Sequence, residues 1–284
     1  MPVHGSDASY DVAVVGLGAM GSAALAHLAA RGQLVIGIER FQPGHDRGSS
    51  HGESRAIRLG YFEHPSYVPL ARRAFENWRA LERRTGESVL VVTGILEAGH
   101  AGGRLVSGSL EACLLHGLEH ELLDPAEVHR RFPAVILPDD YTAMWQPQGG
   151  IVKADRANAL HLATAREDGA EIIAGTKVLA IEPGPAAVRI VCEGRTIEAG
   201  SVVLAAGPWM SELLPSLRGV LSLSRLVLTW YQPKRPELFR LGALPVFAVE
   251  SEDDIVYGFP DFAATGFKCA SHFASGSLDQ ADDA

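Results

Sequence analysis

The sequence predicts an α/β fold combined with a second, α+β domain on a mixed or antiparallel sheet. The apolar run Tyr10–Val15 ends in glycine and precedes the Ala-rich, proline-free segment Gly18–Arg31 and a second apolar run, Gln33–Glu39. This order predicts a buried strand, a helix and a parallel strand. Another buried strand, Ser201–Ala206, comes late in the chain, and from Leu223 onward apolar residues alternate as in antiparallel strands.

The other elements follow from apolar periodicity and from turn residues. Helices are predicted at Tyr67 to Arg84, Leu105–His116, Asp124–Arg131 and Asp155–Asp168. Strands are predicted at Glu87–Gly99, Glu171–Ala174, Lys177–Glu182, Val188–Cys192, Arg195–Ala199, Leu226–Tyr231, Val246–Glu250, Ile255–Phe259 and Gly266–His272. The segment Gly44–Glu53, rich in Gly, Ser and His, is predicted to be a loop.

Composition and charge exclude several classes of function. The chain of 284 residues has a formal net charge of −9, whereas a nucleic-acid-binding surface needs a basic stripe. No apolar run approaches the roughly 20 residues of a membrane-spanning helix. Cys113, Cys192 and Cys269 are widely spaced and form no CxxC pair, so no disulfide framework is predicted. We expect a soluble, cytoplasmic protein without a metal site, and we favour a monomer.

Residues 16–21, GLGAMG, match the pattern G-x-G-x-x-G after a strand and before a helix. Gly16 permits a tight turn, Gly18 lets the backbone approach a pyrophosphate, and Gly21 lets the helix pack against the strand. The helix N-terminus offers its N–H groups and positive dipole end to the phosphates. Glu39 is placed to bind ribose hydroxyls, which disfavours NADP. The motif predicts dinucleotide binding without separating NAD from FAD, and a glycine-rich turn without a ligand is the alternative.

A second segment favours FAD. In Ser201–Gly207 (SVVLAAG), a buried strand leads to small residues that allow close backbone approach. Such a late strand is typical of two-domain flavoproteins, although an ordinary central strand is the alternative. We therefore predict a Rossmann-type FAD-binding domain at residues 1–90 and 145–222, and a substrate domain at 91–144 and 223–273. Residues 274–284 are small, polar and acidic, so a disordered tail is predicted.

Two further segments carry residues suited to substrate chemistry. Residues 48–58, GSSHGESRAIR, contain Arg55 and Arg58, and the planar guanidinium group suits a carboxylate. If Gly266–His272 is a strand, Lys268 and His272 share one face and Cys269 lies on the other. A Lys and a His beside a flavin would stabilise negative charge and transfer protons. A solvated loop and a solvent-facing edge strand are the alternatives.

These segments resemble the monomeric sarcosine oxidase and N-methyl-tryptophan oxidase family, within the class of glycine and D-amino-acid oxidases. The resemblance runs from Tyr10 to His272, and its most specific parts are GSSHGESRAIR, YVPLARRAFENWRALE, AAGPWMSELLP and YGFPDFAATGFKCASH. It implies oxidation of a secondary, N-methyl or cyclic amino acid to an imine, with transfer of a hydride equivalent to flavin N5. O2 would then reoxidise the flavin and yield H2O2.

The resemblance also implies residue roles. Lys268 would activate O2, Arg55 would lie over the flavin ring, Arg58 would bind the substrate carboxylate, and Tyr257 and His272 would line the amine pocket. Ser54 stands where relatives often have Thr, and an aromatic or apolar pocket is expected around Tyr231, Phe247 and Tyr257. The predicted cofactor-binding residues are Gly16, Gly18, Ala19, Met20, Gly21, Glu39, Arg40, Ser49, Ser50, Arg55, Val178, Ala206, Gly207 and Trp209.

The resemblance has one departure. Members of the family continue well beyond the Lys268–His272 strand, and none of the three cysteines matches the one that links covalently to the flavin. We therefore expect FAD without covalent attachment at that position. A flavin-dependent amine dehydrogenase, a catalytically inactive nucleotide-binding remnant and an NAD-dependent dehydrogenase stay as alternatives.

Overall fold

The structure is a computed structural model that describes residues 9–263, 265–273, 276–278 and 281. The chain divides into two compact units. Unit 1 contains Met1–Glu53, Ala154–Leu223 and Leu278–Ala284, and unit 2 contains Ser54–Lys153 and Ser224–Ser277. These divisions differ from the predicted ones at residues 90 and 145, because the segment from residue 54 to residue 90 and that from 145 to 153 fall in unit 2. The assignment of functional domains stays a prediction.

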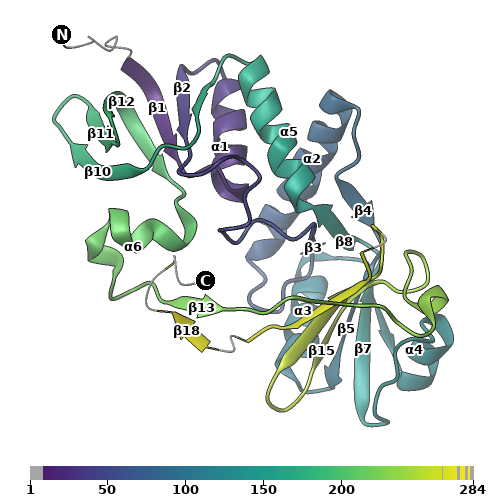
Figure 1. Ribbon diagram of the computed structural model, residues 1–284. Helices are drawn as coiled ribbons and strands as arrows, with labels where there is room; N and C mark the ends of the chain where they lie inside the picture. The colour runs from purple at the N-terminus through teal and green to yellow at the C-terminus, as the bar shows by residue number, and fades with distance from the viewer. Residues whose placement is uncertain (1–8, 264, 274–275, 279–280, 282–284) are drawn as a thin grey trace, which may run out of the picture. The chain divides into compact units, whose positions relative to one another are not determined.

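Unit 1 is built on a six-stranded sheet with the strand order β10-β11-β12-β1-β2-β9 (Figure 1). Strands β12, β1, β2 and β9 are parallel, whereas β10, β11 and β12 form an antiparallel meander. Its elements are β1 (Ser9–Val15), α1 (Ala19–Ala29), β2 (Val35–Ile38), α5 (Ala154–Glu167), β9 (Glu171–Ile173), β10 (Val178–Pro183), β11 (Val188–Cys192), β12 (Arg195–Leu204), η1 (Gly207–Trp209), α6 (Met210–Leu213) and η2 (Pro215–Leu217).

Apolar side chains on the two faces of the unit 1 sheet form two separate cores. On one face, Leu25 of α1 and Leu162 of α5 pack against Val14 of β1. On the other face, Val15 and Ile38 pack with residues of the meander, such as Ile190. Burial on both faces explains the continuous apolar runs of β1 and β2 in the sequence, and it holds the carboxyl ends of these parallel strands side by side.

Unit 2 contains a seven-stranded sheet with the order β14-β17-β16-β15-β5-β7-β6 and a three-stranded antiparallel sheet with the order β3-β8-β4. Figure 1 labels β15, β5 and β7 of the first sheet and all three strands of the second. In the large sheet only β15 and β5 pair in parallel. The elements are β3 (Ser54–Arg58), α2 (Tyr67–Thr85), β4 (Leu90–Val92), β5 (Ile95–His100), α3 (Arg104–His116), β6 (Glu121–Leu123), α4 (Pro125–Arg131), β7 (Tyr141–Gln146), β8 (Gly149–Lys153), β14 (Thr229–Tyr231), η3 (Pro236–Leu238), β15 (Val246–Glu250), β16 (Ile255–Phe259) and β17 (Phe267–Ser271). Two short strands, β13 (Leu223–Arg225) and β18 (Gly276–Leu278), pair with each other.

The α/β fold class with a mixed second sheet is confirmed, and the differences lie in single elements. Residues 54–58 of the arginine segment form strand β3, because each residue pairs with one of β8. The predicted strand Glu87–Gly99 is two strands, interrupted at Gly94, whose φ is +70°. Strands β6, β7 and β8 lack a prediction. Within the predicted tail, Gly276–Leu278 forms β18, and the tail residues 274–275, 279–280 and 282–284 lie outside the described residues.

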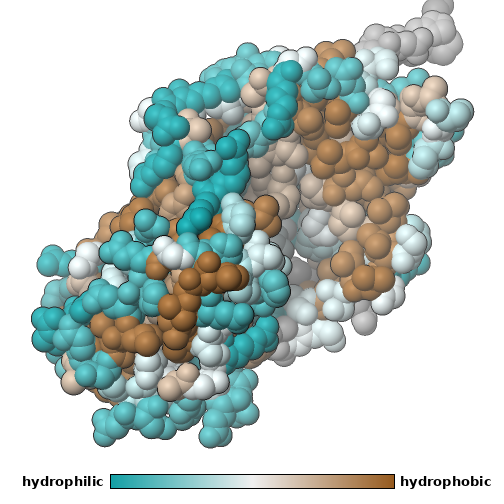
Figure 2. All heavy atoms as spheres, turned by 180° about the vertical axis from the view of Figure 1, so that it is seen from behind, coloured by the Kyte–Doolittle hydropathy of each residue, from teal (hydrophilic) through white to brown (hydrophobic). Residues whose placement is uncertain are grey.

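The described part of the chain contains no helix that is both long and apolar enough to cross a membrane. Figure 2 shows brown, apolar areas between teal, polar ones on the face turned away in Figure 1. Strand β14 and the residues before it contribute large exposed apolar side chains, since Leu226, Val227, Trp230 and Tyr231 are 39% to 56% exposed.

Candidate functional site

The glycine turn of unit 1, residues 16–21, leaves no space for a side chain at Gly16 or Gly21. Gly16 follows β1 with a φ of +87°, and a Cβ placed there would lie 2.5 Å from the carbonyl oxygen of Ala205. A Cβ on Gly21 would lie 1.7 Å from the carbonyl oxygen of Gly16. Both clashes are with backbone atoms, which do not move as a flexible side chain does. The two glycines therefore hold β1, α1 and the end of β12 at the close spacing that a dinucleotide-binding turn requires.

The N-terminus of α1 meets the serine-rich loop. Gly18 is the N-cap residue of α1 and has no side chain to cap it. The N–H of Ala19 donates to Ser50 Oγ at 2.9 Å, and a Cβ on Gly18 would lie 2.9 Å from the same oxygen. Met20 in the first turn is 79% exposed. The hydroxyl oxygen of Ser50 thus accepts a hydrogen bond from one of the N–H groups that bind phosphate at a helix N-terminus of this type.

Glu39 ties the second strand to the glycine turn. Its carboxylate is 6% exposed and directly follows β2. Oε2 accepts from the N–H of Leu17 at 2.7 Å and Oε1 accepts from the N–H of Phe41 at 3.1 Å, while His45 Nε2 lies 3.4 Å from Oε1. This position, beside the turn and at the carboxyl end of a parallel strand, is the one that a ribose-binding acid occupies.

The remaining predicted cofactor residues of unit 1 lie in three places. The guanidinium group of Arg40 lies over the rings of Phe41 and Trp209, at 5.1 Å and 5.3 Å from their centroids. Gly207, with a φ of +53°, and Trp209 belong to η1, which directly follows Ala206, two residues beyond the end of β12. Val178 is buried in the apolar core beneath the meander. Ser49 precedes Ser50 in the loop. The binding roles of these residues stay predictions.

In unit 2, one face of the large sheet carries two of the predicted catalytic residues, Lys268 and Tyr257. The register places Glu97 of β5 beside Ala248 of β15, then Tyr257 of β16, then Ala270 of β17. The neighbouring row places Phe259 of β16 beside Lys268 of β17 and Trp230 of β14. Residues opposite each other in a sheet share a face. Lys268, Tyr257 and Glu97 therefore lie on the same face, as period-two reasoning predicts for Lys268.

Lys268 is a buried cation with oxygen and aromatic neighbours. It is 3% exposed, and its Nζ donates to the backbone oxygen of Ser54 at 3.1 Å and to Ser54 Oγ at 3.0 Å. The rings of Trp230 and Phe259 lie 5.2 Å and 5.0 Å from Nζ. Oxygen acceptors and ring faces both stabilise an ammonium group away from water. Lysine side chains are almost never buried in this manner unless they are paired.

Arg55 of β3, Tyr257 of β16 and His272 beyond β17 differ in their surroundings. Arg55 donates from Nη1 to the backbone oxygen of Ser54 at 2.7 Å. Tyr257 is half-buried, and burial raises the pKa of its hydroxyl although Arg55 opposes this effect. His272 follows β17, is exposed, and packs its ring against Phe62 at a centroid distance of 6.1 Å. Burial therefore keeps Tyr257 neutral as a hydrogen-bonding group, whereas His272 lies in contact with solvent.

Arg58 is surrounded by two carboxylates and two rings. Its Nη2 donates to both oxygens of Glu63, at 2.9 Å and 3.1 Å, and its Nε lies 3.4 Å from Oε1 of Glu97. The rings of Tyr61 and Phe62 lie 4.4 Å and 5.2 Å from the guanidinium carbon. Burial lowers the pKa of Arg58, but Glu97 and Glu63 outweigh it, so the pKa rises and the group stays charged.

Glu97, Glu63 and Trp230 are site residues that the sequence analysis missed. The signal for Glu97 was an acid inside the apolar strand Ile95–Gly99, because a buried acid needs partners. Glu63 and Trp230 carry no comparable signal, since an acid in a polar segment and a single aromatic residue are common in any sequence. Tyr231 and Phe247 were expected beside Tyr257, but the register places them on the opposite face.

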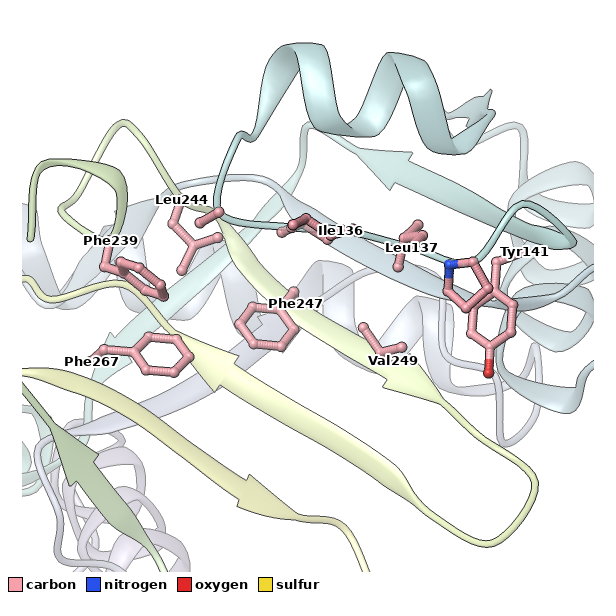
Figure 3. Close-up of a pocket in the computed structure, with 11 residues that line it drawn as sticks. Ile136, Leu137, Tyr141, Phe239, Leu244, Phe247, Val249 and Phe267 are labelled. Atoms are coloured by element: carbon pink, nitrogen blue, oxygen red, sulfur yellow. The ribbon is translucent and has the colours of Figure 1, made fainter. Parts of the chain in front are cut away.

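That opposite face carries a cavity of about 300 Å³ (Figure 3). Its lining is apolar and aromatic, and in Figure 3 the rings of Phe239, Phe247 and Phe267 lie close together. Phe247, which was expected in a substrate pocket, lines it, whereas none of the predicted catalytic or cofactor-binding residues does. The cavity is therefore separate from the face that carries Lys268. The described part of the chain contains no group of three or more His, Cys, Asp or Glu side chains arranged to hold a metal ion.

Comparison with known proteins agrees with this geometry. The FAD dependent oxidoreductase (DAO) family matches residues 11–283. The monomeric sarcosine oxidase of Streptomyces avermitilis is 40% identical over 254 residues, which are 89% of this chain and 66% of that protein. The monomeric sarcosine oxidase of Bacillus sp. (strain NS-129) is 34% identical over 95% of this chain and 70% of its own length. The N-methyl-L-tryptophan oxidase of Yersinia pestis (strain Pestoides F) is 33% identical over 88% of this chain and 67% of that protein.

Solved structures agree as well. The amino acid oxidase NikD in its open form has a TM-score of 0.80 and 28% identity, with 97% of this chain and 72% of that chain covered. Glycine oxidase from Geobacillus kaustophilus has a TM-score of 0.74 at 22% identity, over 95% of this chain and 72% of that chain, and supports the fold alone. This chain thus spans about two thirds of the length of the curated relatives named above.

Proposed function

Since the chain belongs to the FAD-dependent oxidoreductase (DAO) family and is an FAD-dependent oxidoreductase, we propose that it oxidises secondary, N-methylated amino acids. The proposal rests on the sheet face of unit 2 that carries Lys268, Tyr257 and Glu97. Arg58 of β3 reaches this face, because its Nε lies 3.4 Å from Oε1 of Glu97. The relatives named for oxidation of sarcosine and N-methyl-L-tryptophan support this substrate class.

The residues of unit 1 fit FAD. Gly16 and Gly21 leave no space for side chains, Ala19 directs an N–H toward Ser50, and Glu39 is buried at the strand end. We propose that Gly18, Ala19 and Ser50 hold the pyrophosphate, that Glu39 accepts from ribose hydroxyls, and that Arg40, Ala206, Gly207 and Trp209 complete the site. We propose no covalent attachment through Cys113, Cys192 or Cys269. When bound, FAD accepts a hydride equivalent from the amino acid and passes its electrons to O2, giving H2O2.

The residues of unit 2 bind and orient the substrate in this proposal. Arg58 binds the substrate carboxylate through its planar guanidinium group. The neighbouring ring of Tyr61 and the carboxylate of Glu97 already hold this group in place. Tyr257 and His272 line the amine pocket, and Arg55 stabilises negative charge. The buried charge of Lys268 favours the reduction of O2 to an anionic species. The imine product reacts with water, which releases formaldehyde from an N-methyl substrate.

The test uses the purified protein supplied with FAD. We expect the visible spectrum of bound flavin, its bleaching by sarcosine or N-methyl-L-tryptophan without O2, and H2O2 when O2 is admitted. A colourless protein that FAD does not reconstitute would favour the inactive nucleotide-binding remnant. Bleaching without later H2O2 would favour a dehydrogenase that uses another electron acceptor. We propose a cytoplasmic monomer, and ultracentrifugation tests the oligomeric state.

A matched pair of variants tests the role of Arg58. Arg58→Lys keeps the positive charge but loses the planar group that binds both carboxylate oxygens. We expect KM for the amino acid to rise about tenfold, which corresponds to about 1.4 kcal/mol of lost binding. Arg73→Lys changes an exposed arginine on α2, paired with Glu76, and is expected to leave KM unchanged. Equal KM values for the two variants would remove Arg58 from the binding site.

A further inference from the structure

Glu97 is the most completely buried acid of unit 2, and it lies against Arg58. Its exposed fraction is 0%. Its Oε1 lies 3.4 Å from Arg58 Nε, and its Oε2 accepts from Gln146 Nε2 at 3.2 Å. Gln146 in turn accepts the N–H of Gly60 at 2.9 Å through Oε1. The Glu97 carboxylate is thus fixed between β3, β5 and β7. Glu63, which pairs with the same guanidinium group, has a side chain that is 34% exposed.

The charges around Arg58 do not balance when both acids are ionised. One guanidinium and two carboxylates give a net charge of −1, and a bound substrate carboxylate would make it −2. Like charges that share a buried site raise one another's pKa, so each added negative charge favours protonation of one of the acids. The acid with the least water around it accepts such a proton most readily, because burial penalises its charged form most.

From this geometry we propose that Glu97 is a proton-coupled counter-ion of Arg58: it takes up a proton when negative charge is added at the guanidinium group, as when a substrate carboxylate binds. This inference rests on the proposed role of Arg58 in substrate binding. Glu97 is then a positioning residue, because it acts on the substrate through Arg58. The protonated carboxyl group can still accept from Gln146 Nε2 through Oε2, and without its negative charge the guanidinium charge becomes available to the ligand.

The groups that surround Glu97 favour it as the titrating member. Burial raises the pKa of Glu97 to about 7, although Arg58, Ser109 and Gln146 oppose this and Glu63 adds to it. Cys113 on α3 has a pKa of about 12, raised by burial and by Glu97, so it stays a neutral thiol. Burial also raises the pKa of Tyr61, which stays neutral. From β7 and β15, Gln146 and Ala248 contribute no charge.

The first test measures binding of methoxyacetate to the FAD-loaded protein by calorimetry. Methoxyacetate carries the carboxylate of an N-methylated glycine but has an ether oxygen in place of nitrogen, so it is neither oxidised like an amine nor titrated near neutral pH. We expect its Kd to rise about tenfold from about pH 6.5 to about pH 9, which corresponds to about 1.4 kcal/mol. Buffers of different protonation enthalpy should reveal proton uptake at about pH 8.

Variants assign this proton. In Glu97→Gln, whose amide is always neutral, we expect a Kd that is constant with pH and no proton uptake. Glu76→Gln, which removes an exposed acid on α2, should behave as the unchanged protein does. The proposal is overturned if Glu97→Gln keeps the pH dependence and the proton uptake of the unchanged protein.

A second measurement tests the coupling without a ligand. Glu63 is a negative charge already present on Arg58, so Glu63→Gln should lower the pH at which Glu97 titrates. The side-chain carboxyl signal of Glu97 in 13C-glutamate NMR is identified by its loss in Glu97→Gln. A midpoint that Glu63→Gln does not lower would overturn the coupling. If methoxyacetate fails to bind at every pH while this midpoint falls, the coupling stands and the proposed substrate role of Arg58 fails.

Discussion

Glu39 gives the sharpest prediction for the cofactor-binding unit. Its buried carboxylate accepts two backbone N–H groups, from Leu17 and Phe41, at 2.7 Å and 3.1 Å. In Glu39→Gln, the single amide oxygen can replace only one of these acceptors, and the amide NH2 group then faces the other N–H. Losing a hydrogen bond to a charged group costs about 1.5–3 kcal/mol, and leaving a buried N–H unsatisfied costs about 1–3 kcal/mol. We therefore expect the free energy of unfolding to fall by about 3 kcal/mol.

Urea denaturation measures this loss. With a slope of about 2 kcal/mol per molar urea, a loss of about 3 kcal/mol lowers the midpoint by about 1.5 M. Glu193→Gln is the matched control, because Glu193 is exposed in the turn between β11 and β12 and its side chain should contribute within about 0.5 kcal/mol. FAD affinity, titrated by flavin fluorescence, should also fall in Glu39→Gln alone. Equal midpoints for the two variants would refute a structural role of Glu39 in the glycine turn.

Three further predictions concern single residues. Gly21→Ala places a Cβ 1.7 Å from the carbonyl oxygen of Gly16, so the turn must open and the purified protein should lose its flavin absorbance; retained absorbance would contradict this. Burial raises the pKa of Glu97 from 4.5 to about 7, so its contribution to stability is lost as pH rises between these values. In urea denaturation, the free energy of unfolding of Glu97→Gln should therefore rise relative to that of the unchanged protein by up to about 3 kcal/mol between pH 5 and pH 8. A difference between the two proteins that is constant with pH would argue against this. Lys268→Met should slow flavin reoxidation by O2 at least tenfold (about 1.4 kcal/mol) while anaerobic reduction changes less, which stopped-flow absorbance separates; equal slowing of both steps would exclude a specific role in O2 reduction.

The sequence predicts unit 1 well because its signals are local. Glycines that touch backbone, an apolar run buried on both faces and an acid at a strand end all leave a mark within residues 10–39. The period of two in β17 likewise predicts correctly that Lys268 and Cys269 lie on opposite faces, since alternation is a property of any strand.

Unit 2 is harder to predict because its site depends on pairing between distant segments. Lys268 donates to Ser54 across 214 positions of sequence, and Arg58 lies beside Glu97, which comes from another strand. No local pattern specifies the order of β5, β15, β16 and β17, and this order decides which side chains share a row. For that reason Phe247 was expected beside Tyr257, whereas the register places it on the other face, in the wall of the apolar cavity.

The central claim is oxidation of an N-methylated amino acid with O2 as the acceptor, and product stoichiometry tests it most directly. With the FAD-loaded protein and a limiting amount of sarcosine, we predict equal amounts of H2O2, formaldehyde and glycine, one of each per sarcosine consumed. Formaldehyde without H2O2 would contradict the oxidase assignment, and the absence of both with every N-methylated amino acid would contradict the proposed function itself.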